Sequence, residues 1–308
     1  MNIVIISGLT AILLIVFLLR FNIATKGIRD KEIMLPYNCL IGAEKPSAFI
    51  NFLCKMVAAQ HNDIRLNFCN VKEFTYESYL VICAQAEKAR DNKKKVFYIL
   101  SATLSMPIAN MLMIEDRHQR TFHQHIVGEG AKFIQHSHIT PELINSIEKE
   151  LKRIGIRDYY GLNTLVTEII GNAIEHGIRD QNINWWMHHK VEKNVLKLVF
   201  VDMGLGIISS YRKAKIGCWN RDETIIKDAL NGKIGSSTKK ANRGKGLPQI
   251  DQMVQKKFIS NFILITNTIT LRYINGEYVS YKHSNFVGTY ISLTVNKENF
   301  SKWQKSLT

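Results

Sequence analysis

Three short motifs in the second half of the chain carry side chains that could bind a nucleotide. The first, LNTLVTEIIGNAIEHG over residues 162–177, places Glu168 and Asn172 one helical turn apart beside a stripe of apolar residues. Gly171 lies between them, although a glycine costs about 1 kcal/mol against alanine in a helix interior. The missing side chain leaves room for another group to approach. The motif therefore predicts an amphipathic helix with an oxygen-rich edge.

The second motif is an apolar strand followed by an acid and two glycines. Residues 198–201 are apolar and lead into Asp202, Gly204 and Gly206. A carboxylate at the end of a buried strand can accept a hydrogen bond from an exocyclic amine. The glycines allow the backbone to turn tightly and to come close to a flat ligand. The pattern predicts a pocket wall for such a ligand.

The third motif is RGKGL at residues 243–247, which leads into a run of apolar periodicity that continues through Val254. Gly244 and Gly246 flank Lys245, and glycines at the start of a helix make a loop whose backbone N–H groups can cradle phosphate. Each motif alone occurs often by chance. Their order, their spacing and their placement on a helix, a strand end and a loop together indicate one nucleotide site.

The three motifs together resemble the GHKL family, which includes gyrase-type topoisomerases, heat-shock chaperones, histidine kinases and mismatch-repair ATPases. The resemblance covers about half of the chain, from near Pro141 to Val295. It implies an α/β sandwich, the Bergerat fold, that binds ATP with magnesium. The third glycine of the family's last motif is Pro248 here. Because proline is tolerated in the first turn of a helix, we expect an altered loop and retained binding.

The resemblance implies a role for each residue that matches a family motif. Asn172 would hold the magnesium ion that bridges the phosphates, and Glu168 would orient or deprotonate the attacking nucleophile. Asp202 would accept a hydrogen bond from the adenine amine, and Thr289 in the strand GTYISLTV would support that contact. The remaining cofactor-binding residues would shape the base pocket or wrap the phosphates: Gly204, Gly206, Gly244, Lys245, Gly246 and Leu247.

These residues leave the reaction open. Glu168 acting on water would give an ATPase, and Glu168 acting on a protein hydroxyl would give a serine/threonine kinase similar to anti-sigma-factor kinases. The alternative is a scaffold or conformational switch that binds ATP without turning it over. A histidine kinase is disfavoured, because such kinases place a two-helix hairpin between the phosphoacceptor histidine and the asparagine helix. The gap from His138 to Asn172 has room for one helix, at 141–154.

An uncharged segment opens the chain. Residues 3–19 are almost entirely apolar and are just long enough to cross a hydrocarbon core of about 30 Å at about 1.5 Å per residue. Basic residues follow from Arg20 to Lys31 and none precedes, so the positive-inside rule places the rest of the chain in the cytoplasm. We expect residues 1–22 to form a single-pass anchor in a bacterial-type inner membrane. A signal peptide and a buried core helix are the alternatives.

Helix and strand patterns alternate over residues 37–120, which predicts a small α/β domain with parallel strands. Helices are expected at 46–60, 77–90 and 106–117, and strands at 64–68 and 96–100. The run IRLNFCNVKEFTYESYLVICAQAEKA resembles a STAS domain, the module of anti-sigma-factor antagonists. Ser78 lies near the phosphorylatable serine of that family, although the family's Asp-Ser-Ser-Gly turn is absent. An ordinary position at a helix start is the alternative for Ser78.

Residues 121–140 have little periodicity and are expected to be a linker to the ATP-binding domain at 141–298. In that domain the tryptophans and histidines of WWMHH alternate in a manner suited to a half-exposed sheet, with core packing expected for Trp185 and Trp186. The expected elements are helices at 141–154, 159–176 and 246–257 behind strands at 184–190, 195–201, 262–270, 272–280 and 288–295. A turn is expected at Asn275-Gly276, and a mobile lid over the phosphates at 207–242.

The net charge of +15 requires anionic partners. Anionic lipid headgroups near the anchor and the phosphates of ATP would neutralise part of this charge. No helix-turn-helix, zinc-finger or aromatic-basic RNA signature is visible, so specific nucleic-acid binding is not expected. The five cysteines are scattered without a CxxC pair, which indicates reduced thiols inside the cell. An unidentified protein partner or substrate completes the expected partners, and many members of the GHKL family form homodimers.

Overall fold

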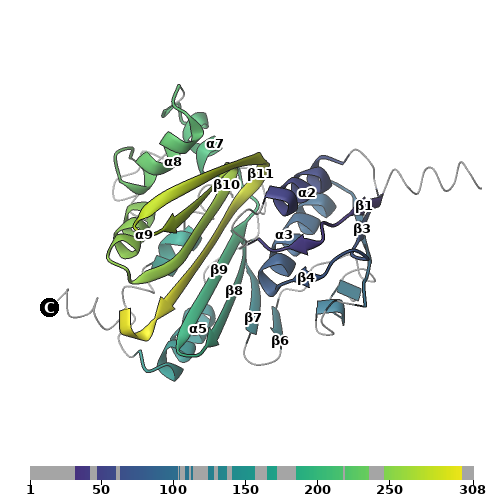
Figure 1. The fold of residues 1–308 in the computed structure, drawn as a ribbon, viewed down its shortest axis with the longest axis horizontal. Coiled ribbons are helices and arrows are strands. Elements are labelled where there is room, and N and C mark those ends of the chain that lie inside the picture. The colour runs from purple at the N-terminus through teal and green to yellow at the C-terminus, as the bar shows by residue number, and fades with distance from the viewer. Residues whose placement is uncertain are drawn as a thin grey trace, which may run out of the picture.

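The computed structural model describes the following parts of the chain: residues 32–41, 47–59, 63–102, 104, 108–110, 112–113, 124–127, 131–136, 141–156, 165–171, 185–217, 219–235 and 246–299. Within them the fold is mixed α/β, and layers of strands alternate with layers of helices (Figure 1). The predicted membrane anchor at 1–22 lies outside these parts. None of the helices that the structure describes is long and apolar enough to cross a membrane.

A small parallel sheet forms one outer layer. Its strands, in spatial order, are β1 (Glu32–Met34), β3 (Asp63–Asn67) and β5 (Lys95–Ile99). Both pairs of neighbours are parallel, as the alternation of strands with helices predicts. The strands expected at 64–68 and 96–100 are confirmed to within one residue. β1 was not expected, because three residues are too few to show an alternating pattern.

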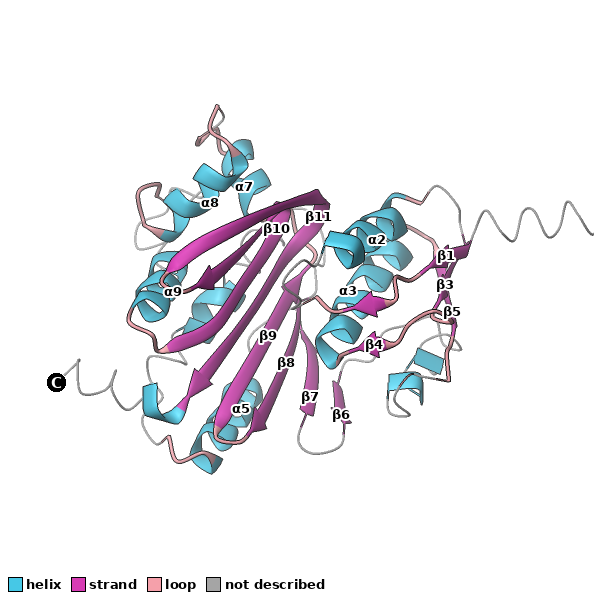
Figure 2. Cartoon of the chain, viewed as in Figure 1, coloured by secondary structure: helices cyan, strands magenta, loops and turns pink. Residues whose placement is uncertain are grey.

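Two helices lie between the small sheet and a larger one (Figure 2). They are α2 (Ser47–Ala58) and α3 (Tyr76–Asp91), each within two residues of its expected bounds. Close to them, β2 (Asn38–Cys39) pairs in parallel with β4 (Glu73–Phe74). Of the helix expected at 106–117, residues 108–110 and 112–113 are described, and they are helical.

The larger sheet has six strands in the order β10-β11-β9-β8-β7-β6, and all neighbours are antiparallel. Its strands are β6 (Gln124–Val127), β7 (Ala131–His136), β8 (Trp185–Glu192), β9 (Val195–Asp202), β10 (Ile259–Ile274) and β11 (Glu277–Asn296). The hairpin between β10 and β11 turns at Asn275 and Gly276, as expected. The three late strands of the prediction are two long strands, because the pairing of β10 with β11 continues through Leu271 and through Lys282 to Phe286, where breaks were expected. Irregularities near Ser260 and Asn267 interrupt the register without ending β10.

The prediction that residues 121–140 form a linker has to be corrected. It contains β6 and β7, which pair with each other, and β7 pairs with β8. The prediction relied on side-chain periodicity, which is weak there. A strand at the edge of a sheet can be held by backbone hydrogen bonds to its neighbour, and such bonds leave little trace in the sequence.

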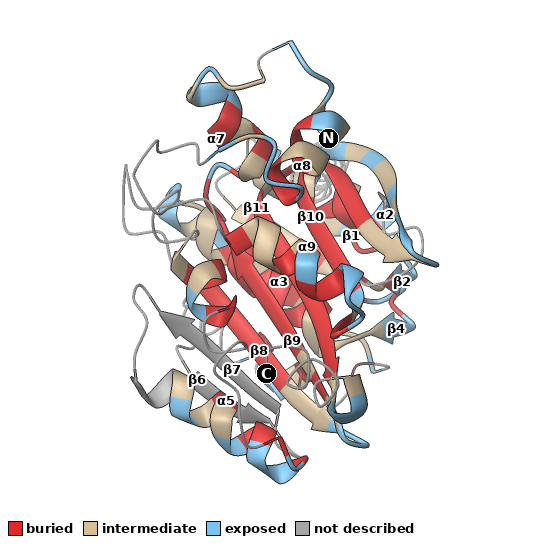
Figure 3. Ribbon diagram, turned by 90° about the vertical axis from the view of Figure 1, so that its left-hand side faces the viewer, coloured by how far each residue is buried: buried red, intermediate tan, exposed pale blue. Residues whose placement is uncertain are grey.

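Both faces of the larger sheet are covered (Figure 3). One face, called the helix-covered face below, carries α5 (Pro141–Arg153), a helical segment at 165–171, α7 (Ile207–Lys213), α8 (Asp222–Leu230) and α9 (Gly246–Gln255). The other face packs against α2 and α3, and apolar side chains from both sides form one continuous core there. The amino-terminal part is therefore an integral layer of the molecule.

The expectation of a half-exposed sheet is wrong for β8. Trp185 and Trp186 are 1% and 3% exposed, and His188 and His189 are 1% and 0% exposed. Trp185 belongs to the core on the helix-covered face, and Trp186 belongs to the core shared with α2 and α3. The core role of both tryptophans is confirmed. The sequence of β8 alone does not reveal that a distant part of the chain covers its second face.

Ser78 holds the start of α3 against the segment that follows β2. Its side chain is fully buried, and its hydroxyl donates a hydrogen bond to the carbonyl oxygen of Cys39 and accepts one from the N–H of Ile41 at 3.4 Å. Thr75 caps the helix by accepting a hydrogen bond from the N–H of Ser78 at 3.3 Å. This environment favours the structural role for Ser78, because a kinase would reach the hydroxyl only if the helix start opened.

Replacing Ser78 by alanine should lower the free energy of unfolding by about 1–3 kcal/mol, because the carbonyl of Cys39 and the N–H of Ile41 would lose a buried partner. Urea denaturation measures this change. Ser284→Ala removes an exposed hydroxyl and should change the stability by less than about 0.5 kcal/mol. Equal effects of the two substitutions would show that the buried hydroxyl contributes nothing specific.

Candidate functional site

The acid at the end of β9 is held by two residues of the expected site. Asp202 pairs in register with Thr289 on β11, and the carboxylate accepts hydrogen bonds from the hydroxyl and the backbone N–H of Thr289. The N–H of Gly204 also donates to the carboxylate, at 2.8 Å. Asp202, Gly204 and Thr289 are thus brought together by direct contacts, as expected from the resemblance.

The carboxylate of Asp202 lies in a desolvated environment. The residue is 7% exposed, and burial raises the pKa of its carboxyl group to about 6 against the opposing effect of its hydrogen bonds. Because the hydrogen-bond donors satisfy only part of a carboxylate's acceptor capacity, the group can still accept a hydrogen bond from a ligand. A buried acceptor with remaining capacity is a strong discriminator between ligands that donate and ligands that do not.

The backbones of β9 and β11 come unusually close beside this acid. Gly288 has a φ of +92°, and a Cβ atom placed on it would lie 1.9 Å from the carbonyl oxygen of Asp202. No other residue fits there without displacing one of the two strands. The glycine therefore sets the distance between Thr289 and Asp202. The sequence motif GTY gave no reason to expect this contact.

The turn after Asp202 is fastened by a side chain from β10. Gly206, at the start of α7, has a φ of +79°, and a Cβ atom on it would lie 2.6 Å from Oδ1 of Asn267. The amide of Asn267 donates hydrogen bonds to the carbonyl of Leu205 at 2.9 Å and to the hydroxyl of Ser209 at 2.8 Å. Its Oδ1 accepts a hydrogen bond from the N–H of Ser209 at 3.2 Å. Asn267 therefore closes over the glycine-rich turn.

The neighbouring Thr266 completes this fastening. Its hydroxyl accepts a hydrogen bond from the N–H of Ile207 at 2.8 Å and lies 3.3 Å from the carbonyl of Gly288. Sequence reasoning missed both Thr266 and Asn267. The available signal was the polar triplet TNT inside the otherwise apolar run FILITNTITL. Polar residues at the centre of a buried strand need partners, and here the partners are the backbone groups of the turn.

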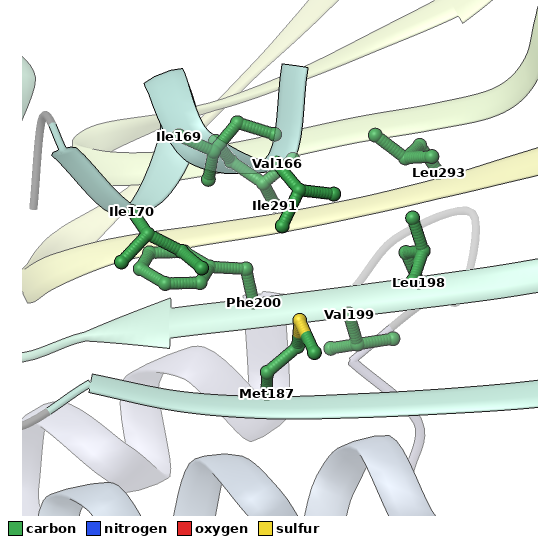
Figure 4. A pocket seen from close by; sticks show the side chains of 9 residues that line it. All are labelled: Val166, Ile169, Ile170, Met187, Leu198, Val199, Phe200, Ile291 and Leu293. Carbon is green, nitrogen blue, oxygen red and sulfur yellow. The ribbon is translucent and has the colours of Figure 1, made fainter. Parts of the chain in front are cut away.

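A helical segment at 165–171 lies over the strands that carry this acid (Figure 4). Val166, Ile169 and Ile170 point to side chains of β8, β9 and β11, among them Phe200 and Ile291, around a small apolar cavity of about 20 Å³. Of the apolar stripe expected for the first motif, Leu165, Val166 and Ile169 are buried as predicted, and Leu162 and Ala173 lie outside the described residues. The helical segment is thereby fixed on the sheet by apolar packing.

The same packing places the first motif on the face that carries the acid. Phe200 pairs with Ile291, and this pair is two residues along the strands from the pair of Asp202 and Thr289. Side chains two residues apart on a strand point to the same face, so the acid lies on the helix-covered face, roughly 7 Å from the row beneath the helix. Glu168 is partly exposed on this helical segment.

Gly171 has no close neighbour among the described residues. A Cβ atom on it would meet none of their atoms within 4 Å, the backbone of its own helix left aside. This agrees with the expectation that a missing side chain allows another group to approach. Burial of Leu165, Val166, Ile169 and Ile170 against the sheet accounts for the stability of the segment in spite of the glycine.

The third motif is described from Gly246 onward. α9 begins at Gly246, and Pro248 lies in its first turn, as the expectation about proline required. Pro248 packs beside Gly232 after α8, where a Cβ atom on the glycine would be 3.5 Å from its ring. Gly246 is buried, and Leu247 packs against the core on the helix-covered face. The first turn of α9 therefore lies on the same face as Asp202.

The expected residues Asn172, Gly244 and Lys245 lie outside the described parts of the chain. Within those parts, no group of three or more His, Cys, Asp or Glu side chains could hold a metal ion. The magnesium ligand expected from the resemblance is Asn172, so this finding does not bear on it. Asp202 is hydrogen-bonded to Gly204 and Thr289, and Thr266 and Asn267 hold the turn that follows, which contains Gly206. Glu168, Gly246 and Leu247 share the face of Asp202.

No protein-family model, curated protein or solved structure matches this chain. The resemblances to the GHKL and STAS families therefore rest on the motif residues and on the positions those residues take in the fold.

Replacing Gly288 by alanine should lower the free energy of unfolding by more than about 3 kcal/mol or prevent folding, because the new Cβ would overlap the carbonyl of Asp202. Gly276→Ala is a matched control. Gly276 has a nearly identical φ of +91° but open space around it, so only the left-handed backbone costs energy, about 1–2 kcal/mol. Urea denaturation of both variants compares them. Similar losses would mean that the strands are not held at this distance.

Asp202→Asn should become more stable relative to the unsubstituted chain as the pH rises from 4 to 7. The folded-state pKa of Asp202, about 6, exceeds its usual value of 3.8. The stability contributed by the protonated carboxyl is therefore complete below about pH 4 and is lost as pH rises through 6, by up to about 3 kcal/mol. An amide cannot titrate and shows no such loss. Denaturation curves at several pH values measure the difference, and Asp91→Asn, at an exposed carboxylate, should follow the unsubstituted chain.

Proposed function

We propose that this chain binds ATP with magnesium on the helix-covered face of its larger sheet and acts as a signalling protein at the cytoplasmic side of a membrane. The observation that carries the proposal is the buried carboxylate of Asp202, held by Gly204 and Thr289 at the end of β9. In the GHKL family, which this chain resembles, the matching acid reads the adenine base.

The chemistry of this acid favours adenine over guanine. The exocyclic amine of adenine is a donor and can satisfy the remaining acceptor capacity of the carboxylate. Guanine presents a carbonyl oxygen at the equivalent ring position, and two acceptors facing each other in a desolvated pocket repel. Asn267 and Thr266 support the proposed base contact by holding the turn from Leu205 to Ser209, which follows Asp202.

The arrangement of the elements also supports a GHKL-type sandwich. The helical segment with Glu168, the strand end with Asp202 and the first turn of α9 at Gly246 are all on one face of an antiparallel sheet. Asn172 would hold the magnesium ion, and Gly244, Lys245 and Gly246 would hold the phosphates. The metal ion, when bound, neutralises phosphate charge. Glu168 would orient or deprotonate a water or a protein hydroxyl, and its partial exposure is compatible with either.

A route from this site to the amino-terminal layer supports a role as a switch. The amide of Asn267 lies 3.5 Å from Oδ1 of Asn285. The carbonyl of Asn285 accepts a hydrogen bond from the thiol of Cys54 on α2 at 3.1 Å, and the N–H of Ser284 donates to Asn51 on α2 at 3.1 Å. A change in the glycine-rich turn would therefore reach α2, which belongs to the STAS-like part of the chain. A protein partner would read that change.

The second candidate is a scaffold that binds ATP without hydrolysis or transfer. The dense hydrogen bonding around Asp202 favours binding, whereas turnover depends on Glu168 and on the phosphate-binding residues. Full-length protein in detergent, incubated with ATP labelled at the γ-phosphate, separates the candidates. Free phosphate identifies an ATPase, labelled protein identifies a kinase, and unchanged bound ATP identifies a scaffold.

Asp202→Asn should weaken ATP binding by about 10- to 100-fold, because it removes a charge-assisted hydrogen bond worth roughly 1.5–3 kcal/mol. Equilibrium binding of ATP and GTP to the full-length protein measures this loss. The unsubstituted chain should bind ATP more tightly than GTP. The control Asp91→Asn should bind both nucleotides with the same affinities as the unsubstituted chain. If the Asp202→Asn variant binds ATP as tightly as the unsubstituted chain, the assignment of the base pocket is refuted.

Glu168→Ala should bind ATP within a factor of about three of the unsubstituted chain and should lose at least about 100-fold in turnover, if the chain is an enzyme. Release of labelled phosphate, or label in protein, follows the turnover. Thr167→Ala, at the exposed neighbouring position, is the control and should keep both properties. Unchanged turnover in the Glu168→Ala variant would remove this residue from the reaction.

A further inference from the structure

A second cavity lies on the opposite face of the larger sheet, where the start of α3 meets β9, β10 and β11. Its volume is about 410 Å³, which is within the range of small-molecule sites. The polar residues that line it come from both parts of the chain and include Thr75, Glu77, Lys197, Arg272, Ser292 and Thr294. Binding pockets occur preferentially at such junctions.

This cavity is separate from the site at Asp202. On β9, Lys197 pairs with Thr294 of β11, and Ser292 is two residues earlier on the same strand. Thr289 and Ile291 point to the helix-covered face. Ser292 alternates with them along β11 and therefore points to the opposite face. The two sites therefore lie on opposite sides of the same strands.

The charges that line the cavity favour an anion. Glu77 forms an ion pair with Lys197, whose side chain is 45% exposed. Burial opposes ionisation of Glu77, but the charge and hydrogen bond of Lys197, with help from Thr75, lower the pKa of Glu77 to about 2. The carboxylate is thus neutralised within the cavity, and the guanidinium of Arg272 adds a second positive charge. The positive end of the α3 dipole lies at the same place.

Neutral hydrogen-bonding groups make up much of the remaining lining. Thr75, Ser292 and Thr294 contribute hydroxyls, and Asn261 contributes an amide. Ser292 and Thr294 are 4% and 8% exposed. The hydroxyl of Ser292 is hydrogen-bonded to Tyr290, and that of Thr75 accepts from the N–H of Ser78. A hydroxyl has one donor and two acceptor positions, so each keeps capacity for a further hydrogen bond with a hydroxylated ligand.

We propose that this cavity binds a sugar phosphate, with Arg272, Lys197 and the start of α3 facing the phosphate and the hydroxyl and amide groups of β10 and β11 facing the sugar. The combination of a planar guanidinium with a helix N-terminus suits a phosphate oxyanion. The hydroxyl and amide groups suit a polyhydroxylated body. A ligand that contacts α3 and the sheet together stabilises the packing of the two parts.

Thermal unfolding of the full-length protein in detergent tests the proposal, with ribose 5-phosphate, inorganic phosphate and ribose as probes. Ribose 5-phosphate should raise Tm with the logarithm of its concentration above Kd, by about 5 °C at roughly 100 times Kd. Inorganic phosphate should give a smaller shift, and ribose should give none. Arg272→Gln and Thr294→Val, the latter an isosteric loss of one hydroxyl, should each weaken ribose 5-phosphate at least about tenfold. Arg221→Gln, at an exposed arginine, should leave the affinity unchanged.

The outcomes distinguish this site from the proposed ATP site. Ribose 5-phosphate should bind Asp202→Asn and the unsubstituted chain equally, whatever happens to ATP. Loss of binding in Asp202→Asn would place the ligand in the other pocket and overturn the proposal. The absence of a shift that exceeds the shift with inorganic phosphate would also overturn it. A shift that persists undiminished in Arg272→Gln would overturn it as an unspecific effect of the anion.

Discussion

Burial of the larger sheet on both faces is the constraint on which the rest of this structure depends. Strands β9 and β11 must supply apolar side chains alternately to two cores, so Phe200 and Ile291 serve the helix-covered face while Val199 and Tyr290 serve the face shared with α2 and α3. A slip of the register by one residue would exchange the two sets and would bury polar groups on both sides. The register is therefore strongly determined, and with it the place of every polar residue on these strands.

The candidate site follows from that register. Asp202 is the last residue of β9, and it is on the helix-covered face because the alternation that buries Leu198 and Phe200 continues for one more step. Placing a carboxylate there costs desolvation energy, which its three donors only partly recover, and the raised pKa expresses the balance. A position that is costly in the free protein and improved by a donor is what a base-recognition pocket requires. The conformation around it is held by Gly288 on one side and by Asn267 on the other.

The two faces of the sheet are linked physically although they carry different chemistry. The proposed ATP site and the polar cavity share β9 and β11, and contacts from Asn285 and Ser284 reach α2. The amino-terminal layer therefore contacts the same strands that carry Asp202 and Thr289.

The sequence by itself determined the local features of this protein. Apolar periodicity located α2, α3, β3, β5, β8 and β9 to within a few residues, and the resemblance to the GHKL family grouped Asp202, Gly204 and Thr289 before any contact was known. Tertiary structure alone decided that α2 and α3 cover the second face, that β6 and β7 extend the sheet, and that Asn267 and Gly288 hold the site. The reason is that propensity and periodicity act between neighbours in the chain. The burial of His188, the approach of Gly288 to Asp202 and the polar cavity at Glu77 arise between residues far apart in sequence, and only the packed chain brings those residues together.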